Sequence, residues 1–284
     1  MRCPRRLESH DISKREPSHD VCRRRTGDAR LSVQSRPAAP LLSVVLVTYK
    51  RLDLLERTLY SLLEVVTYPR NRIEIILSDD GSPQAIQDAM RDLPCNKFLL
   101  SSRNRGMGSN TNEGIRAATG DYILHLQDDW LCRGPADFVP TAIEALEELP
   151  DVGLVRLHEP ARGEFDVHQL PTGRRVHVYR SRDNFAYSDR PHIKRRSFHR
   201  MLGYYSEELS IPETELEFCR RFEAQHDYRA AFIEGYSAFV NMGESRSFNP
   251  CIRRGRWLRP LQRHWLTGPV LEFARTVKRR LIPS

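Results

Sequence analysis

The chain has few cysteines, and they follow no pattern. There is no C-x-x-C pair and no series of regular spacings among them. The sequence therefore predicts free thiols in a reducing compartment. The six residues concerned are Cys3, Cys22, Cys95, Cys132, Cys219 and Cys251.

Long apolar runs are also missing near the N-terminus. The run "LLSVVLV" at 41–47 is much shorter than the roughly 20 residues that a membrane helix needs. The first residues, "MRCPRRLESHD", lack the apolar segment of a signal peptide. We therefore expect a cytoplasmic protein, with the inner face of the membrane as an alternative location.

The middle of the chain carries no excess of basic charge, although the whole chain has a net charge of +8. Residues 1–40 carry ten Lys or Arg against five Asp or Glu, and residues 251–284 carry nine against one. Residues 41–250 therefore carry a net charge of −5. A body that binds nucleic acid is expected to be basic. We expect no nucleic-acid partner. A nucleic-acid binder that acts through its basic ends is the least favoured of the three functions considered.

Two common phosphate-binding loops are absent as well. The turn after the first predicted strand reads "TYKRLDLLE" and contains no glycine, whereas a dinucleotide fold needs a glycine-rich turn at this place. The P-loop pattern G-x-x-x-x-G-K-[ST] occurs nowhere. Both usual nucleotide-binding explanations of an α/β sheet are therefore disfavoured.

What the chain does contain is a regular alternation of apolar strands and amphipathic helices from residue 41 onward. The predicted strands are 41–49, 72–82, 97–102, 121–129 and 152–157. The predicted helices are 51–66, 82–93, 108–120, 135–149 and 214–225. This alternation predicts an α/β fold with a doubly wound, mostly parallel sheet flanked by helices.

The remaining segments are less regular. In the downstream half, 158–250, we expect antiparallel strands at 174–181 and 192–200. Residues 1–40 have little to bury and predict a disordered basic leader. Residues 251–284 predict a basic amphipathic C-terminal helix. One side of that helix would carry Leu266, Val270, Ala274, Val277 and Leu281.

Three of the predicted strands end in polar residues, where ligands bind in such sheets. These ends are "TYK" at 48–50, "SDDGS" at 78–82 and "QDDW" at 127–130. Two carboxylates roughly 4 Å apart repel by about 4 kcal/mol at an effective dielectric near 20. The adjacent Asp128 and Asp129 therefore favour a cation between them, and such oxygen ligands suit a hard divalent ion.

At this point four stretches together resemble a known family. Residues from Leu41 to about Leu157 resemble the nucleotide-sugar half of a family 2 glycosyltransferase of the GT-A fold. "SVVLVTYKR" resembles the first strand of that family and "ILSDDGS" its uridine-binding second strand. "NRGMGSNTNEGIRAATGDYILHLQDDW" resembles the N-x-G…N-x-G…G-[DE]-Y-I…D-x-D stretch, spacing included. "GYYSEELSIPETELEFCRRF" resembles the acceptor-side segment that holds the catalytic base.

The resemblance implies roles for residues on the donor side. Tyr49 would stack on the base of the donor, and Asp80 would bond that base, with Asp79 beside it. Asn104 and Asn112 would line the donor pocket.

The resemblance also implies a metal site and a catalytic base. Asp129 matches the last carboxylate of D-x-D and would hold Mg²⁺ or Mn²⁺ against the diphosphate, helped by Asp128. Glu215 falls on the general base and Arg221 on the motif arginine, with Glu213 as a second candidate for the base.

The chain departs from the family pattern at three of these places. Gln127 stands at the first acid of D-x-D, and Glu215 stands where the family usually has Asp. Asn241 stands at the histidine that often completes the metal site, and it could coordinate through its carbonyl oxygen.

Each of these features has a structural alternative. "SDDGS" is also an ordinary turn, and Tyr49 could simply cover the core. The pair Asp128 and Asp129 could cap the helix predicted after it. Glu215 could be a solvated helix residue, and His125 is expected to be a core histidine.

We therefore predict an inverting glycosyltransferase that moves a sugar from a nucleoside-diphosphate sugar to an acceptor hydroxyl. The acceptor would be a carbohydrate or lipid-linked, in cell-surface polysaccharide or glycoconjugate synthesis. The basic segment 251–284 either packs as a solvated face or docks on anionic lipid. The alternative function is a non-catalytic sugar-nucleotide-binding or scaffold protein on the same fold.

Overall fold

The computed structural model describes residues 39, 41–158, 163–182 and 186–243. The predicted C-terminal helix at 251–284 and, apart from Ala39, the predicted leader at 1–40 lie outside these residues. The predicted domain boundaries therefore stay predictions.

The described part of the chain is built on a nine-stranded sheet in the order β3-β2-β1-β4-β9-β6-β10-β8-β7. Its strands are β1 Leu42–Thr48, β2 Ile73–Asp79, β3 Lys97–Leu100, β4 Tyr122–Gln127, β6 Val152–Arg156, β7 Phe165–Gln169, β8 Arg175–Tyr179, β9 His192–Arg195 and β10 Arg229–Ile233. A separate two-stranded antiparallel ribbon joins β5 Trp130–Cys132 to β11 Phe239–Asn241.

The upstream half of the sheet is parallel, as predicted. Strands β3, β2, β1 and β4 run in the same direction. β9 is inserted between β4 and β6 and is antiparallel to both. β8 is also antiparallel to its neighbours. The antiparallel strand expected at 174–181 is thus β8, and the one expected at 192–200 is β9 over its first four residues only, since Phe198–Leu202 form helix α5.

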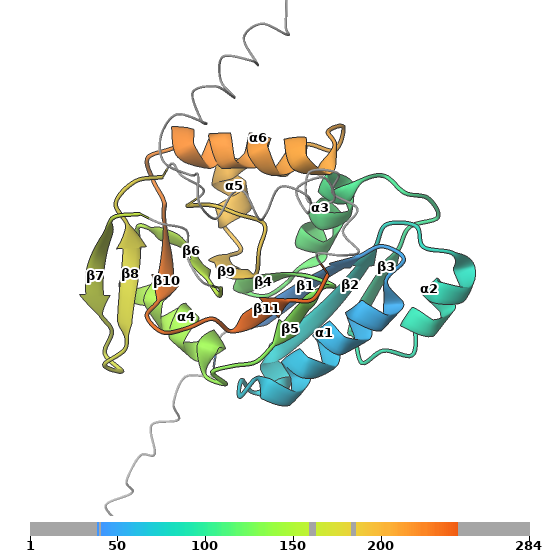
Figure 1. The fold of residues 1–284 in the computed structure, drawn as a ribbon, viewed down its shortest axis with the longest axis horizontal. Coiled ribbons are helices and arrows are strands. Elements are labelled where there is room, and N and C mark those ends of the chain that lie inside the picture. The colour runs from blue at the N-terminus through green and yellow to red at the C-terminus, as the bar shows by residue number, and fades with distance from the viewer. Residues whose placement is uncertain (1–38, 40, 159–162, 183–185, 244–284) are drawn as a thin grey trace, which may run out of the picture. The chain divides into compact units, whose positions relative to one another are not determined.

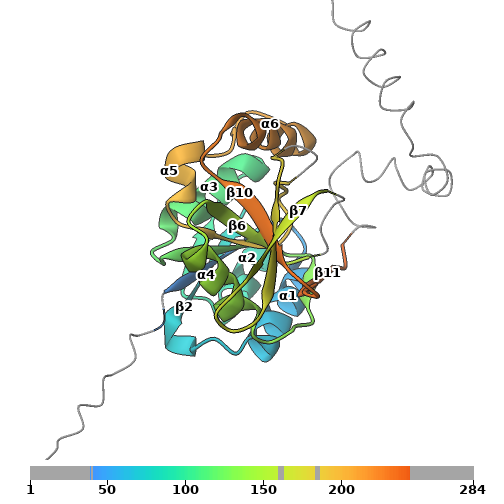
Figure 2. The same cartoon turned by 90° about the vertical axis from the view of Figure 1, so that its left-hand side faces the viewer.

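Helices cover both faces of the sheet (Figure 1, Figure 2). They are α1 Leu52–Val65, α2 Gln84–Met90, α3 Met107–Ala117, α4 Phe138–Glu148, α5 Phe198–Leu202 and α6 Ile211–Ala224, with a short 3₁₀ turn at Arg70–Arg72. One hydrophobic core lies under α1, α2 and α4, and the other under α3, α5 and α6.

Strand β1 shows why this sequence forms a central strand. All seven of its residues are buried. Because side chains alternate along a strand, Val44 and Leu46 join the core under α1, while Val45 and Val47 join the core under α3. A continuous apolar run is what a strand covered on both faces requires.

The expectations about membrane-spanning helices and about free thiols can both be compared with the structure. Within the described residues, no helix combines the length and the apolar character needed to cross a membrane. Cys95, Cys132 and Cys219 are free thiols, as predicted. The other three cysteines lie outside the described residues.

Candidate functional site

The three polar strand ends meet at one edge of the sheet. In the parallel register, Thr48 at the end of β1 lies opposite Asp79 on β2, and Val47 lies opposite Gln127 on β4. β2 and β3 lie on one side of β1, and β4 lies on the other, so the strand order reverses at β1. Open α/β sheets bind ligands at such a point. The aromatic ring and the two carboxylate pairs predicted from the sequence therefore belong to one region.

Asp128 is the buried member of the second carboxylate pair, with no exposed surface. The Thr48 hydroxyl donates to its Oδ2 at 2.7 Å, and the Arg51 guanidinium binds both of its oxygens. Burial raises the pKa of Asp128 to about 6, against the opposing effect of Arg51. Its backbone carbonyl also accepts from Thr58 on α1 at 2.8 Å, so this turn is fixed from two sides.

Asp129 differs from Asp128 in how its two oxygens are used. Arg51 Nη1 lies 3.1 Å from Asp129 Oδ2. Asp129 Oδ1 is buried and has no hydrogen-bond partner within the described residues. A buried carboxylate oxygen left in this way is costly unless a further group contacts it. Oδ1 is therefore the atom of this pair that fits a ligand.

The ribbon of β5 and β11 closes over Asp129. The Met242 N–H donates to the Asp129 carbonyl at 2.8 Å, and Asn241 is paired in register with Trp130. A Cβ built at Gly243 would overlap the Asp129 carboxylate, so only a glycine fits this approach. The half-buried Asn241 thus lies beside the Asp129 segment, and its side-chain oxygen accepts from the Gly243 N–H at 3.0 Å.

The first carboxylate pair divides into a turn-forming and a loop-binding residue. Asp79 accepts from the Ser82 backbone N–H and from Gln87 Nε2, each at 2.8 Å, and the Ser82 hydroxyl adds a third bond. This is the ordinary turn role that the sequence left open. Asp80 instead reaches across to the loop before α3.

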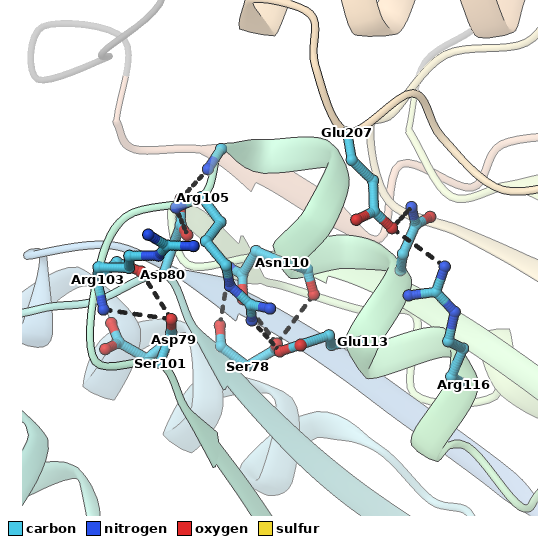
Figure 3. A network of polar contacts seen from close by, with 12 residues as sticks. Ser78, Asp79, Asp80, Ser101, Arg103, Arg105, Asn110, Glu113, Arg116 and Glu207 are labelled. Atoms are coloured by element: carbon cyan, nitrogen blue, oxygen red, sulfur yellow. Dashed lines mark hydrogen bonds and ion pairs between the residues drawn. The ribbon is translucent and has the colours of Figure 1, made fainter.

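Asp80 binds that loop through two backbone groups. The N–H groups of Arg105 and Gly106 donate to its two oxygens at 2.7 and 3.0 Å (Figure 3). Burial raises the pKa of Asp80, and these two N–H groups oppose the rise. A carboxylate has about four lone-pair sites, so Asp80 keeps acceptor capacity beyond these two bonds.

The turn at Gly81 allows the loop to come this close. Gly81 has a φ of +81°, and a Cβ there would overlap the backbone carbonyl carbon of Arg103. We expect Gly81→Ala to lower the free energy of unfolding by roughly 3 kcal/mol or more, because left-handed strain and a backbone clash add. Urea unfolding would measure it.

Gly173 offers a matched control for that substitution. Its φ is +83°, but a Cβ there would meet nothing within 4 Å. Gly173→Ala should cost only the conformational strain, about 1–2 kcal/mol. Equal losses in the two variants would show that the close approach at Gly81 contributes nothing.

The predicted donor-side asparagines lie in different environments. Asn104 is exposed in the loop that binds Asp80. Asn112 is fully buried; its amide binds the backbone carbonyl and N–H of Tyr205 and donates to the Glu207 carboxylate. Asn110, which the sequence reasoning missed, binds the carbonyls of Thr48 and Ser78. It therefore ties α3 to the ends of β1 and β2.

Tyr49 lies half-buried directly after β1. Lys50 next to it has a φ of +59°, and its Nζ lies 4.7 Å from the centre of the Tyr49 ring. The Lys50 N–H donates to the Ser82 hydroxyl at 2.8 Å, which links this turn to the "SDDGS" turn. The turn that carries Tyr49 is thus held close to the Asp79–Asp80 turn, and Tyr49 itself is only half-buried.

The two candidate bases on α6 differ in their surroundings. Glu213 is exposed and forms a capping box, in which its carboxylate accepts from the Ser210 N–H and hydroxyl. Glu215 is half-buried, and the backbone N–H of Asp189 faces its carboxylate. Burial raises the pKa of Glu215 to about 7, and the charge of Asp189 adds to the rise. This environment suits a general base much better than a capping role.

A chain of neighbours leads from the strand edge toward Glu215. The ring of Trp130, one residue after Asp129, lies 5.9 Å from the ring of His158. Arg190 acts electrostatically on both His158 and Glu215. Arg190 therefore lies near both His158, which packs beside Trp130, and the candidate base on α6.

An open groove of about 800 Å³ lies beside the loop that binds Asp80. It is lined by residues 99–103 and by Arg105, Glu113, Arg116 and Ala117. Figure 3 shows Arg105 beside Glu113 and Arg116 beside Glu207 along α3. Asp129 and Glu215 are not among the residues that line this groove, which borders the donor side through Arg105.

Comparison with known proteins identifies the family. The model of the family described as glycosyl transferase family 2 matches residues 43–206, which is more than half of the chain. The chain belongs to this family. The matched range contains both carboxylate pairs and both predicted asparagines.

Two curated relatives match less than half of the chain. Validoxylamine A glucosyltransferase from Streptomyces hygroscopicus subsp. limoneus is 38% identical over 139 residues, which cover 45% of this chain and 30% of the relative. Poly-beta-1,6-N-acetyl-D-glucosamine synthase from Staphylococcus epidermidis is 32% identical over 117 residues, covering 40% and 27%. The chain thus matches less than a third of the length of these relatives.

Solved structures agree with the family fold. The S. aureus TarS 1-349 structure has a TM-score of 0.55 at 17% identity, covering 72% of this chain and 61% of that chain. Its complex with UDP-GlcNAc has a TM-score of 0.54 at 16% identity, covering 70% and 57%. At such identities the likeness establishes the fold, and the predicted GT-A type α/β fold is confirmed.

The family's divalent metal can be tested against the residues of this family 2 chain. The described residues contain no group of three or more His, Cys, Asp or Glu that could hold a metal ion. However, Asp129 Oδ1, which has no hydrogen-bond partner within the described residues, is a hard oxygen donor, and Asn241 on the facing strand β11 carries another in its amide. Donor sets of this kind suit Mg²⁺ or Mn²⁺ when the substrate supplies further oxygens, so the residues fit the ion.

Arg51 is the main site residue that sequence reasoning missed. It follows β1 and binds both Asp128 and Asp129. The signal was present, because a basic residue at the end of one strand faces an acidic pair at the end of the next. The sequence could not show the backbone conformation of Lys50, whose φ is +59°, and therefore could not show the direction in which Arg51 points.

Proposed function

We propose that this family 2 chain is an inverting glycosyltransferase that moves a sugar from a nucleoside-diphosphate sugar to an acceptor hydroxyl. The observation that carries the proposal is the convergence of Asp80 after β2 with Asp128 and Asp129 after β4, on either side of β1, with one oxygen of Asp129 unbonded within the described residues. The acceptor would be a carbohydrate or lipid-linked, in cell-surface polysaccharide or glycoconjugate synthesis.

The donor base would bind between Tyr49 and Asp80. Tyr49 offers a half-buried ring for stacking, and Asp80 keeps acceptor capacity for a base N–H. Asp79 supports this turn through Ser82 and Gln87 rather than through a ligand. Recognition of a base by stacking and one carboxylate would orient the diphosphate toward Asp129.

The diphosphate end would bind at Asp129. Asp129 Oδ1 and the Asn241 carbonyl would hold a Mg²⁺ or Mn²⁺ ion, while Arg51 and Thr48 keep Asp128 in place behind them. When bound, the ion would neutralise charge that develops on the departing diphosphate.

Glu215 would act as the general base. Its raised pKa, about 7, lets it accept a proton at neutral pH from the acceptor hydroxyl. The hydroxyl then attacks the anomeric carbon on the face opposite the leaving group, which inverts the configuration there. Trp130 would give the acceptor sugar an apolar floor beside His158.

Calorimetry tests the donor and metal parts of the proposal together. We expect UDP or GDP to bind at least about tenfold more tightly with Mn²⁺ than with EDTA. A panel of sugar conjugates of the nucleotide that binds would then be tested for Mn²⁺-dependent hydrolysis. Hydrolysis that requires the metal supports an enzyme.

The second candidate is a non-catalytic sugar-nucleotide-binding protein on the same fold. The observation in its favour is that Arg51 already neutralises part of the charge of Asp128 and Asp129, with Gln127 in place of a third acid. Nucleotide binding of equal strength with and without metal, together with no hydrolysis of any conjugate, would favour this candidate. Docking of residues 251–284 on anionic membranes stays a prediction outside the described residues.

A further inference from the structure

A segment outside the helices and strands lies against helix α3. It comprises residues 203–210, called here the strap, and it joins the end of α5 to the start of α6. α6 carries Glu215 near its start, so the position of the strap sets the position of the proposed base. Because the strap belongs to no helix or strand, contacts with neighbouring elements must hold it in place.

Three residues of α3, spaced four apart, form the surface under the strap. Residues at this spacing share one face of a helix. A Cβ built at Gly108 would overlap the carbonyl oxygen of Ser206, so only a glycine allows this close approach. One turn later, Asn112 is hydrogen-bonded to the strap. One turn further, Arg116 Nη2 lies 3.1 Å from Glu207 Oε1 (Figure 3). The strap therefore runs along this face of α3.

Asn112 is the central contact, and the strap uses both donor hydrogens of its amide. The side chain is fully buried. Its Nδ2 donates to the Tyr205 carbonyl at 2.9 Å and to Glu207 Oε1 at 2.8 Å, while its Oδ1 accepts from the Tyr205 N–H at 2.9 Å. An Asn amide has two donor hydrogens, and both are engaged here. This arrangement favours a role on the strap over the donor-pocket role that the family resemblance implies.

Helix α6 holds the strap from another side. Arg221 on α6 donates from Nη1 to the Leu202 carbonyl at 2.7 Å and from Nη2 to the Tyr204 carbonyl at 2.8 Å. At the other end of the strap, Ser210 is the N-cap of α6. The strap is therefore bonded both to α3 and to the helix that carries the proposed base.

Tyr205 connects Asn112 to that helix. Its backbone binds Asn112, and its ring stacks on the ring of Phe218 on α6, with the centroids 4.4 Å apart. Phe218 is fully buried and follows Glu215 by three residues, which is nearly one helical turn. Since protein interiors are close-packed, a shift of Tyr205 would also shift α6.

We propose that Asn112 is a positioning residue for Glu215 and that it acts through the strap. By holding Tyr205 on α3, Asn112 would keep α6 where the Glu215 carboxylate can reach the acceptor hydroxyl. A misplacement of about 1 Å can reduce a rate by about a hundredfold, so this anchoring matters for the reaction. The inference rests on the proposed role of Glu215 as the base of a glycosyltransferase.

Asn112→Asp tests the inference with little change of shape. It removes both donor hydrogens and places a carboxylate against the Tyr205 carbonyl and the Glu207 carboxylate. Hydrogen-exchange mass spectrometry should show the strap amides and the first turn of α6 exchanging at least about tenfold faster than in the wild type. Calorimetry should give an affinity for UDP or GDP with Mn²⁺ that stays within about twofold of the wild type, because the bonds of Asn112 go to the strap.

A rescue and a matched control separate this effect from a general loss of stability. Adding Glu207→Gln to Asn112→Asp should slow the strap exchange again by about threefold or more, because the Gln amide can donate to the new carboxylate. Asn110→Asp makes the same chemical change at another buried residue of α3. Its partners are the carbonyls of Thr48 and Ser78, so strap exchange should stay as in the wild type.

A second variant keeps the test decisive if Asn112→Asp fails to fold. Glu207→Ala removes the strap carboxylate that accepts from Asn112 and Arg116, and this side chain is partly exposed. It should accelerate strap exchange by about threefold, because the Tyr205 bonds to Asn112 remain. Wild-type strap exchange in a folded Asn112→Asp, or in Glu207→Ala where Asn112→Asp does not fold, would overturn the inference.

Kinetics separate this inference from the proposed function. Where transfer is measurable, Asn112→Asp should lower kcat by about tenfold or more with an unchanged donor KM, and the added Glu207→Gln should restore part of it. A weaker nucleotide affinity with an unchanged kcat would return Asn112 to the donor pocket and would also overturn the inference. A chain without transferase activity would refute the proposed function, while strap exchange and nucleotide affinity would still decide the role of Asn112.

Discussion

Replacing Asp129 with Asn is expected to lower kcat/KM for sugar transfer by roughly a thousandfold or more, because metal stabilisation of a leaving group is worth several kcal/mol. Asp129 Oδ1 is buried and has no hydrogen-bond partner in the part of the chain that the structure describes, and Oδ2 is paired with Arg51. Asn keeps the size of the side chain but removes the charge and one oxygen. Either orientation of the amide places an NH₂ group against Arg51 or against the bound ion.

The protein should remain folded, because Asp128 carries the contacts that hold the turn. Circular dichroism and the urea midpoint would verify the fold, and calorimetry should show that Mn²⁺ no longer tightens nucleotide binding. Asp166→Asn is the matched control, since it removes one carboxylate from an exposed ion-pair cluster. Turnover by Asp129→Asn within tenfold of the wild type would refute the metal role.

The sequence alone was enough to predict at which edge of the sheet the candidate site lies. The strand pattern predicted that Thr48, Asp79 and Asp128 lie at the ends of strands of a parallel sheet. The structure shows these strands, β1, β2 and β4, as parallel neighbours with their carboxyl ends at one edge. The pattern could not tell Asp79 from Asp80. Which of two adjacent carboxylates closes the turn depends on where Ser82 and Gln87 lie, and that is set by the start of α2.

Contacts between distant segments were beyond the sequence. Asn112 binds Tyr205, 93 residues later, because α3 and the segment before α6 cover the same face of the sheet. Nothing in the local pattern around Lys194 indicates a fully buried charge. Its burial follows from the insertion of β9 between β4 and β6, whereas the sequence predicted only an antiparallel strand there.

The second large effect is expected for the base. Glu215→Gln should lower kcat by about 10²–10⁴-fold, which is the usual contribution of a positioned general base. The donor KM should change little, because Glu215 lies on α6, away from Tyr49 and Asp80 at the strand ends. Gln is nearly the same size and can still accept from the Asp189 N–H, so the local fold should persist.

The pH dependence of kcat tests the role of Glu215 as the base independently. Glu215 must be ionised to accept a proton, and its pKa is raised to about 7 by burial and by Asp189. Wild-type kcat should therefore fall as the pH drops through about 7, and this acidic limb should be absent from the residual rate of Glu215→Gln.

Glu213→Gln provides the matched comparison one half-turn earlier on α6. Its carboxylate belongs to the capping box with Ser210, so the substitution should cost about 0.5–1 kcal/mol of stability and leave kcat and its pH profile nearly unchanged. The reverse pattern, with a large loss of kcat in Glu213→Gln and little in Glu215→Gln, would move the base two residues toward the N-terminus. In that case burial and the contact with Asp189 would have no part in proton transfer, because Glu213 is exposed and takes its partners from its own helix end.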